Sequence, residues 1–159
     1  MDLTGERWRA QLKTFVDQQT AGRHVPEERR RGVWSTLRNT AEAGLARGAL
    51  EFFLLALTND GGPPVSLLVS SMPLGRTPAD PQKYAAWLEA RDPRKQVSLV
   101  DLAAGTAVRV LGATTLSVHV WMPDGAGYLT LSFSAPLTGM TGPMERLCDA
   151  IAGSLRWVV

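Results

Sequence analysis

The sequence predicts an α+β fold, in which a mostly antiparallel sheet of six or seven strands packs with helices and follows an N-terminal αα-hairpin. Three observations support this. Apolar residues recur at helical spacing over residues 5–48, apolar and polar residues alternate with period two in later segments, and an amphipathic stretch follows the last of these. No internal repeat or long linker interrupts the 159 residues, so we expect a single domain, with 5–48 as the helical hairpin and 49–159 as the α+β core.

The first two helices are predicted from their apolar faces and from residues that start and stop helices. We expect the first helix over residues 5–21, with Thr4 as its N-cap and Gly22 at its end. The second begins at Pro26, before two glutamates that suit the positive end of a helix dipole, and ends near Gly48. The apolar faces consist of Trp8, Leu12, Phe15 and Val16 in the first helix and of Val33, Trp34, Leu37, Ala41 and Leu45 in the second.

A β-hairpin is expected next. Residues 49–58 are apolar on both faces except at Glu51, which predicts a central strand that is covered on both sides. The sequence Asn-Asp-Gly-Gly at 59–62 predicts a turn into a second strand over 65–72. Residues 73–81 hold three prolines and a glycine, so we expect a loop there.

A third helix is predicted from its two ends. Asp80 is placed to cap the helix, Pro81 to occupy its first position, and the pair Asp92-Pro93 to close it. Two short strands, 97–102 and 107–111, are expected to follow, with a turn at Gly105.

The last third of the chain, residues 114–159, reads as strand, tight loop, strand, helix and a short final strand over 155–159. Alternation in both arms of the hairpin indicates one buried face, formed in the first arm by Leu116, Val118, Val120 and Met122 and in the second by Leu129, Leu131 and Phe133. The helix begins at Gly142-Pro143, and its apolar stripe consists of Met144, Leu147, Cys148, Ile151 and Leu155.

This order of elements, with Leu131-Ser132-Phe133-Ser134-Ala135-Pro136 followed by a helix that ends in Ser154-Leu155-Arg156-Trp157, resembles the Mog1/PsbP-like fold, especially its small actinobacterial members. The resemblance covers residues 49–159 and implies a non-enzymatic role. Members of that fold include regulators of a small GTPase, photosystem accessory subunits and lipoprotein-type binding domains. The helical hairpin over 5–48 is an addition to the bare fold, and the lipoprotein signal of the secreted members is absent.

Composition and charge argue against several classes of protein. A formal net charge of +2 does not indicate a polyanion as the partner. Cys148 is the only cysteine, so the chain has no internal disulfide. Residues 1–7 contain no apolar signal region, and the longest apolar run, residues 50–57, is too short to cross a bilayer. We therefore expect a cytoplasmic protein without membrane contact.

Sites for metals and phosphates are not predicted. Two histidines and one cysteine provide no spacing of metal ligands, so we expect neither a metal nor a cofactor. Gly125-Ala126-Gly127 precedes a strand, which indicates a hairpin turn and not a phosphate-binding loop. Cys148 lies on the apolar stripe of the last helix, where a buried and unreactive thiol is expected.

His119 is the candidate base. With Asp101 to orient it and a serine nearby it could support nucleophilic catalysis, and the candidate serines are Ser117, Ser132 and Ser134. No Gly-x-Ser-x-Gly nucleophile motif is present, so we interpret His119 as a half-exposed sheet residue under a helix. It shares a sheet face with Trp121. If helices cover only the other face, the two residues form part of an exposed interaction surface.

The most distinctive charged feature is a basic cluster near the start of the second helix. It combines Arg29, Arg30 and Arg31 with Arg23 and His24, and the tryptophans Trp8 and Trp34 lie on the flanking helices. Two glutamates interrupt the cluster, which is typical of a solvated helix face. If the cluster does bind, an acidic protein surface or a second copy of the chain is favoured over nucleic acid.

The sequence thus predicts a non-catalytic binding or adaptor module, without a specific role, that contacts a protein partner or a second copy of itself. The candidate partner-binding residues are Arg29, Arg30, Arg31, Trp34, His119 and Trp121. Two alternatives stay open. One is a small-molecule binder or weak hydrolase with a pocket near His119, and the other is nucleic-acid binding through Arg29–Arg31.

Overall fold

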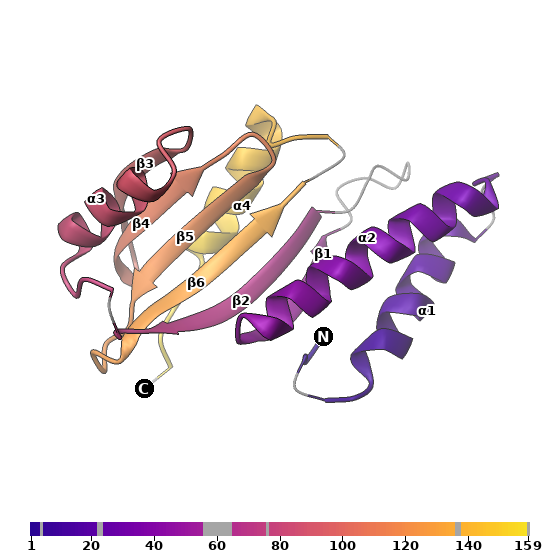
Figure 1. The fold of residues 1–159 in the computed structure, drawn as a ribbon, viewed down its shortest axis with the longest axis horizontal. Helices are drawn as coiled ribbons and strands as arrows, with labels where there is room; N and C mark the ends of the chain where they lie inside the picture. Colours follow the sequence, from indigo (N-terminus) through magenta and orange to yellow (C-terminus); the bar gives the residue numbers. More distant parts are fainter. Residues whose placement is uncertain (4, 22–23, 56–64, 76, 136–137, 159) are drawn as a thin grey trace. The chain divides into compact units, whose positions relative to one another are not determined.

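The computed structural model describes residues 1–3, 5–21, 24–55, 65–75, 77–135 and 138–158 (Figure 1). Its elements are α1 (Trp8–Thr20), α2 (Glu27–Ala46), β1 (Ala49–Leu55), β2 (Val65–Pro73), α3 (Pro81–Arg91), β3 (Gln96–Leu102), β4 (Gly105–Leu111), β5 (Thr115–Trp121), β6 (Gly127–Ser134) and α4 (Gly142–Gly153). The strands form a six-stranded sheet in the order β1-β2-β6-β5-β4-β3. β1 pairs antiparallel with β2, and β3 to β6 pair antiparallel in succession. The predicted α+β fold with an N-terminal αα-hairpin is confirmed.

The chain divides into two compact units, Met1–Ser70 and Ser71–Val159, and the boundary falls inside β2. Each unit has a buried cluster of its own. The predicted single domain, with parts 5–48 and 49–159, stays a prediction.

In the first unit, the helical hairpin packs on β1. The buried residues are Leu3, Trp8, Leu12, Val16, Leu37, Ala41, Ala49 and Phe52. Both helices are shorter than predicted, since α1 begins at Trp8 and α2 begins one residue after Pro26. The predicted cap Thr4 and stop Gly22 lie outside the described residues.

Gly44 in α2 is explained by close packing against β2. A Cβ atom at this position would lie 2.7 Å from Cδ2 of Leu68. Glycine weakens a helix interior by roughly 1 kcal/mol relative to alanine, so the helix gives up stability here in exchange for closer approach to the strand.

β1 is an edge strand, and the predicted central position is wrong. Phe52 is fully buried against the helices, but Leu50 and Phe53 are 45% and 43% exposed. On the side away from β2, the strand forms backbone hydrogen bonds with a short segment, residues 1–3. There the Leu3 N–H donates to the Leu50 carbonyl at 3.2 Å, and the Phe52 N–H donates to the Met1 carbonyl at 2.9 Å. The predicted turn at 59–62 lies outside the described residues.

In the second unit, α3 and α4 cover opposite faces of strands β3 to β6 (Figure 1). α3 is capped as predicted, because Oδ1 of Asp80 accepts hydrogen bonds from the backbone N–H groups of Gln82 and Lys83 at 2.8 and 3.1 Å. α4 is joined to β4 by Arg109, whose guanidinium lies 2.8 Å from both Glu145 and Asp149. The hairpin β5–β6 therefore has two covered faces, where the alternation of its sequence predicts one.

In the last third of the chain, the predicted turn is present and the predicted final strand is not. The Gly125–Gly127 segment is a hairpin turn, as predicted, since the Met122 N–H donates to the Gly127 carbonyl at 2.9 Å. The predicted final strand over 155–159 is wrong, because residues 155–158 form no strand. This tail is held by the Trp157 indole, whose Nε1–H donates to the Ala104 carbonyl at 2.7 Å, and Val158 is 98% exposed.

Candidate functional site

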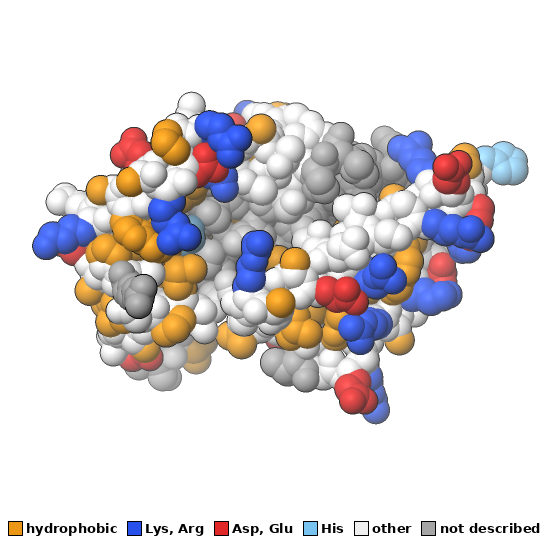
Figure 2. All heavy atoms as spheres, viewed as in Figure 1, with side chains coloured by type: hydrophobic (Ala, Val, Ile, Leu, Met, Phe, Trp, Pro, Cys, Tyr) orange, Lys and Arg blue, Asp and Glu red, His pale blue; other side chains and the backbone are white. Residues whose placement is uncertain are grey.

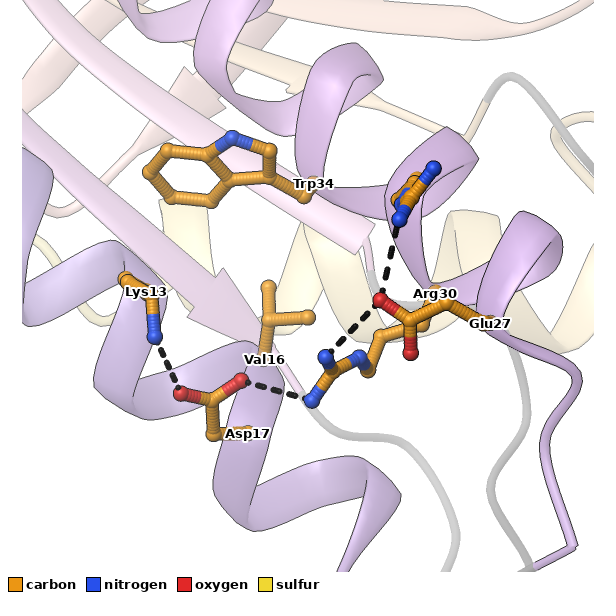
Figure 3. A pocket seen from close by; sticks show the side chains of 7 residues that line it. Lys13, Val16, Asp17, Glu27, Arg30 and Trp34 are labelled. Atoms are coloured by element: carbon orange, nitrogen blue, oxygen red, sulfur yellow. Dashed lines mark hydrogen bonds and ion pairs between the residues drawn. The ribbon is translucent and has the colours of Figure 1, made fainter.

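A groove of about 330 Å³ lies between α1 and α2 (Figure 3). Its lining residues are Lys13, Val16 and Asp17 from α1 and Glu27, Arg30, Arg31 and Trp34 from α2. Their spacings are i, i+3, i+4 in α1 and i, i+3, i+4, i+7 in α2, so each helix contributes one face. The two faces are brought together by one buried cluster, to which α1 contributes Trp8 and Leu12 and α2 contributes Leu37 and Ala41.

The rim of the groove is a chain of ion pairs in which two carboxylates alternate with three cations. Asp17 lies 2.9 Å from Nζ of Lys13 and 3.3 Å from Nη1 of Arg30. Glu27 lies 3.0 Å from Nη2 of Arg30 and 3.5 Å from Nε of Arg31. The hydrogen bond from Lys13 lowers the pKa of Asp17, and the hydrogen bond from Arg30 lowers the pKa of Glu27. Both carboxylates are therefore ionised at neutral pH, and the five groups carry one net positive charge.

The floor of the groove is apolar. Val16 is 3% exposed, and Trp34 is half-buried and packs against the core of the first unit. Both carboxylates of the lining are paired with cations and lie beside an apolar floor, an arrangement that is suited to binding.

The structure separates the members of the predicted basic cluster. Successive helical residues point about 100° apart, so Arg30 and Arg31 line the groove with Trp34, whereas Arg29 is exposed and does not line it. Trp8 is 2% exposed in the core, with the Arg9 guanidinium 4.8 Å from its ring. His24 is exposed, and Arg23 lies outside the described residues.

Figure 2 shows acidic and basic side chains interspersed over the end of the view where α1 and α2 lie. The contribution of α1 to the groove, Lys13 and Asp17, is not among the residues singled out from the sequence. Their i,i+4 spacing predicts an ion pair on the first helix. That this pair faces Arg30 depends on how the two helices pack, which local sequence patterns do not determine.

His119 is buried, and the predicted half-exposed position is wrong: its exposed fraction is 7%. The ring is enclosed by three hydroxyl groups, because Nδ1 lies 2.9 Å from the Tyr84 hydroxyl and 3.2 Å from Oγ1 of Thr130, and Nε2 lies 3.0 Å from Oγ of Ser117. Burial lowers the pKa of His119 to about 4, so the ring is neutral at pH 7. The cause of the difference is α3, which places the fully buried Tyr84 over this face.

Of the other groups considered for catalysis, Ser117 lies within hydrogen-bonding distance of His119, 3.0 Å from Nε2. Asp101 accepts a hydrogen bond from Oγ1 of Thr106 at 3.3 Å. Ser132 pairs with Ser117 in the β5–β6 register, and Ser134 pairs with Thr115. Cys148 is buried as predicted, and burial raises the pKa of its thiol to about 11.

Trp121 belongs to an aromatic stack under α3. Its ring meets Tyr128 edge-on at 5.0 Å, Tyr128 stacks on Tyr84 at 4.1 Å, and Tyr84 stacks on Trp87 at 5.7 Å. The sheet face shared by His119 and Trp121 is thus covered, and the condition under which it would form an interaction surface is not met.

The described part of the chain contains no group of three or more histidine, cysteine or acidic residues arranged to hold a metal ion. None of its helices is both long and apolar enough to cross a membrane.

No protein-family model matches the sequence, and no curated protein matches it. The resemblance to the Mog1/PsbP-like fold therefore stays a prediction.

Proposed function

We propose that the chain is a non-catalytic binding module that acts through contact with another protein, and that the groove between α1 and α2 is its contact surface. The observation that carries the proposal is the groove itself, whose apolar floor of Val16 and Trp34 lies beside a charged rim. Tryptophan and arginine are the residues most enriched among those that dominate protein interfaces.

The alternatives draw less support. A hydrolase or small-molecule pocket at His119 would need a base that reaches a ligand, but this ring is enclosed by Tyr84, Thr130 and Ser117. Nucleic-acid binding through Arg29–Arg31 would need an unbroken run of positive charge, whereas Arg30 is paired with both Asp17 and Glu27, and the Glu27 carboxylate also contacts Arg31.

Two further considerations agree with a binding role. The predicted resemblance of residues 49–159 to the Mog1/PsbP-like fold implies a non-enzymatic role. We also propose that the protein acts in the cytoplasm, where a single free thiol such as Cys148 is the normal state.

Site-specific photo-crosslinking in the source cell tests the proposal. A photoreactive benzoylphenylalanine at position 13 is expected to form an adduct of one defined mass, because this exposed position lies at the groove, and the adduct should be lost in combination with Trp34→Ala. The same group at position 29, which does not line the groove, is the control. An adduct with twice the mass of the chain would identify a second copy as the partner. Adducts at position 29 alone, or none at either position, would contradict the proposal.

A further inference from the structure

We infer that the groove recognises a short acidic segment of a protein, in which a bulky apolar side chain is flanked by carboxylates. The inference rests on the proposed function and specifies the chemistry of the partner. Three observations on α2 support it, at Arg31, Arg38 and Trp34.

The first observation is that Arg31 has unused donors. Its side chain is 78% exposed, and its ion pair with Glu27 is the longest in the groove, at 3.5 Å through Nε. Within the described part of the chain, its two terminal nitrogens form no hydrogen bond. A guanidinium with both terminal nitrogens available is suited to bidentate binding of a carboxylate.

The second observation is the unsatisfied donor of Arg38. Its Nε is buried and has no hydrogen-bond partner among the residues that the structure describes. A buried donor without a partner costs about 1–3 kcal/mol, so the free protein retains an unfavourable feature here. The same burial keeps Nε out of reach of a partner, so a carboxylate would meet this guanidinium through its terminal nitrogens, which are not among the buried unpaired atoms.

The third observation is the order of these residues along α2. Arg31, Trp34 and Arg38 stand at i, i+3 and i+7, which places them on one side of the helix. The indole, which borders the groove with Val16, therefore lies between two cations. The complementary ligand has an apolar side chain for the indole and a carboxylate on either side of it.

The remaining charges favour a peptide over a nucleic acid. Asp17 and Glu27 keep Lys13 and Arg30 paired, so the groove holds only one net positive charge, and the two carboxylates would repel a run of phosphates. A peptide carboxylate placed at Arg31 or Arg38 needs none of these pairs to break.

The test uses the full-length protein and a peptide array. One set of twelve-residue peptides carries a Leu, Phe or Trp flanked by Asp or Glu, in a Gly/Ser background. A second set has Lys in place of the acids, a third has Ala in place of the apolar residue, and labelled oligonucleotides form a fourth set. We expect binding to the first set to be at least tenfold stronger than to the others and to weaken with salt. Equal binding to the Lys set, or preference for the oligonucleotides, would overturn the inference.

Two arginines of α2 provide a matched pair of variants. Arg31→Glu and Arg29→Glu change the net charge equally on the same helix, but only Arg31 lines the groove. We expect Arg31→Glu to weaken binding of the best peptide at least tenfold and Arg29→Glu to change it less than twofold, with the thermal midpoint of each variant measured to confirm folding. If both variants weaken binding equally, the effect is one of overall charge and the inference fails.

Arg38→Met separates recognition from a structural role, because it removes the charge and keeps the aliphatic stem. We expect the variant to unfold at a higher temperature than the parent, since the unsatisfied donor is gone, and to bind the acidic peptide at least fivefold more weakly. Unchanged binding would remove Arg38 from the site. If Trp34→Ala abolishes binding while neither Arg31→Glu nor Arg38→Met affects it, the groove still binds protein but does not recognise acidic residues. In that case the proposed function holds and only the inference about the acidic segment fails.

Discussion

Three hydroxyl groups take the place of water around the buried ring of His119, and this makes the stability of the protein depend on pH. Burial lowers its pKa from 6.5 to about 4. Between these two pH values the unfolded chain binds a proton at this ring and the folded chain does not. The contribution of the neutral ring to the free energy of unfolding is therefore complete above pH 6.5 and is lost as the pH falls towards 4. We expect a loss of about 3 kcal/mol in the free energy of unfolding. Urea denaturation at pH 7, 5.5 and 4 measures it.

His119→Gln is the control for this prediction, because an amide can still form hydrogen bonds with the surrounding hydroxyls but does not titrate. The variant should lose less stability over the same pH range than the parent protein. Equal losses would show that groups other than His119, such as the surface carboxylates, account for the acid sensitivity.

Two glycines of one turn provide a second prediction at the scale of single residues. Gly127 has a φ of +150°, and a Cβ added there would overlap the carbonyl oxygen of Met72. Gly125 has a φ of +72° and no atom within 4 Å of such a Cβ. Gly125→Ala should cost about 1–2 kcal/mol through backbone strain alone, and Gly127→Ala at least about 3 kcal/mol because backbone must move. Thermal unfolding compares them, and equal costs would contradict the close contact.

Among the elements, β1 shows how an exposed sheet edge is protected. Residues 1–3 lie along its outer side, with the Leu3 N–H bonded to the Leu50 carbonyl. Unpaired strand edges are templates for association with another chain. The short segment therefore limits edge-to-edge pairing, in addition to burying the Leu3 side chain, which is 2% exposed.

Leu3→Pro and Leu3→Ala separate these two contributions, since both reduce the apolar contact but only proline removes the N–H donor. We expect Leu3→Pro to show a higher apparent mass than Leu3→Ala in light scattering at raised protein concentration. If the two variants have the same mass at every concentration, the hydrogen-bonded segment does not protect the edge.

Local signals explain which elements the sequence predicts well. Asp80 and Pro81 start α3 because a cap and a first-turn proline act within four residues. The edge position of β1 was missed because Phe52 and Phe53 are equally apolar, and only tertiary packing decides which of the two is buried. The groove itself was not predicted, for the same reason, although three of its residues are among the candidate partner-binding residues. Arg30, Arg31 and Trp34 share one helix, whereas Asp17 reaches them only through the packing of α1 on α2.

At the scale of the whole molecule, we expect the two compact units to unfold together. β2 runs from Val65 to Pro73 and so belongs to both, because the boundary falls at Ser70. A strand cannot melt on one side of a residue without loosening its pairing on the other, and we therefore expect one cooperative transition, as a single domain predicts.

The five tryptophans allow this to be measured, since Trp8 and Trp34 lie in the first unit and Trp87, Trp121 and Trp157 in the second. Replacing the first pair by Phe leaves fluorescence that reports on the second unit, and replacing the other three leaves fluorescence that reports on the first. Within each variant the fluorescence midpoint should coincide with the midpoint from far-ultraviolet circular dichroism, which reports on all of the secondary structure. Because both midpoints come from the same variant, any loss of stability caused by the substitutions shifts them equally. Separated midpoints would mean that Met1–Ser70 and Ser71–Val159 are independent domains, and the helical hairpin with its groove would then be a module that can be studied alone.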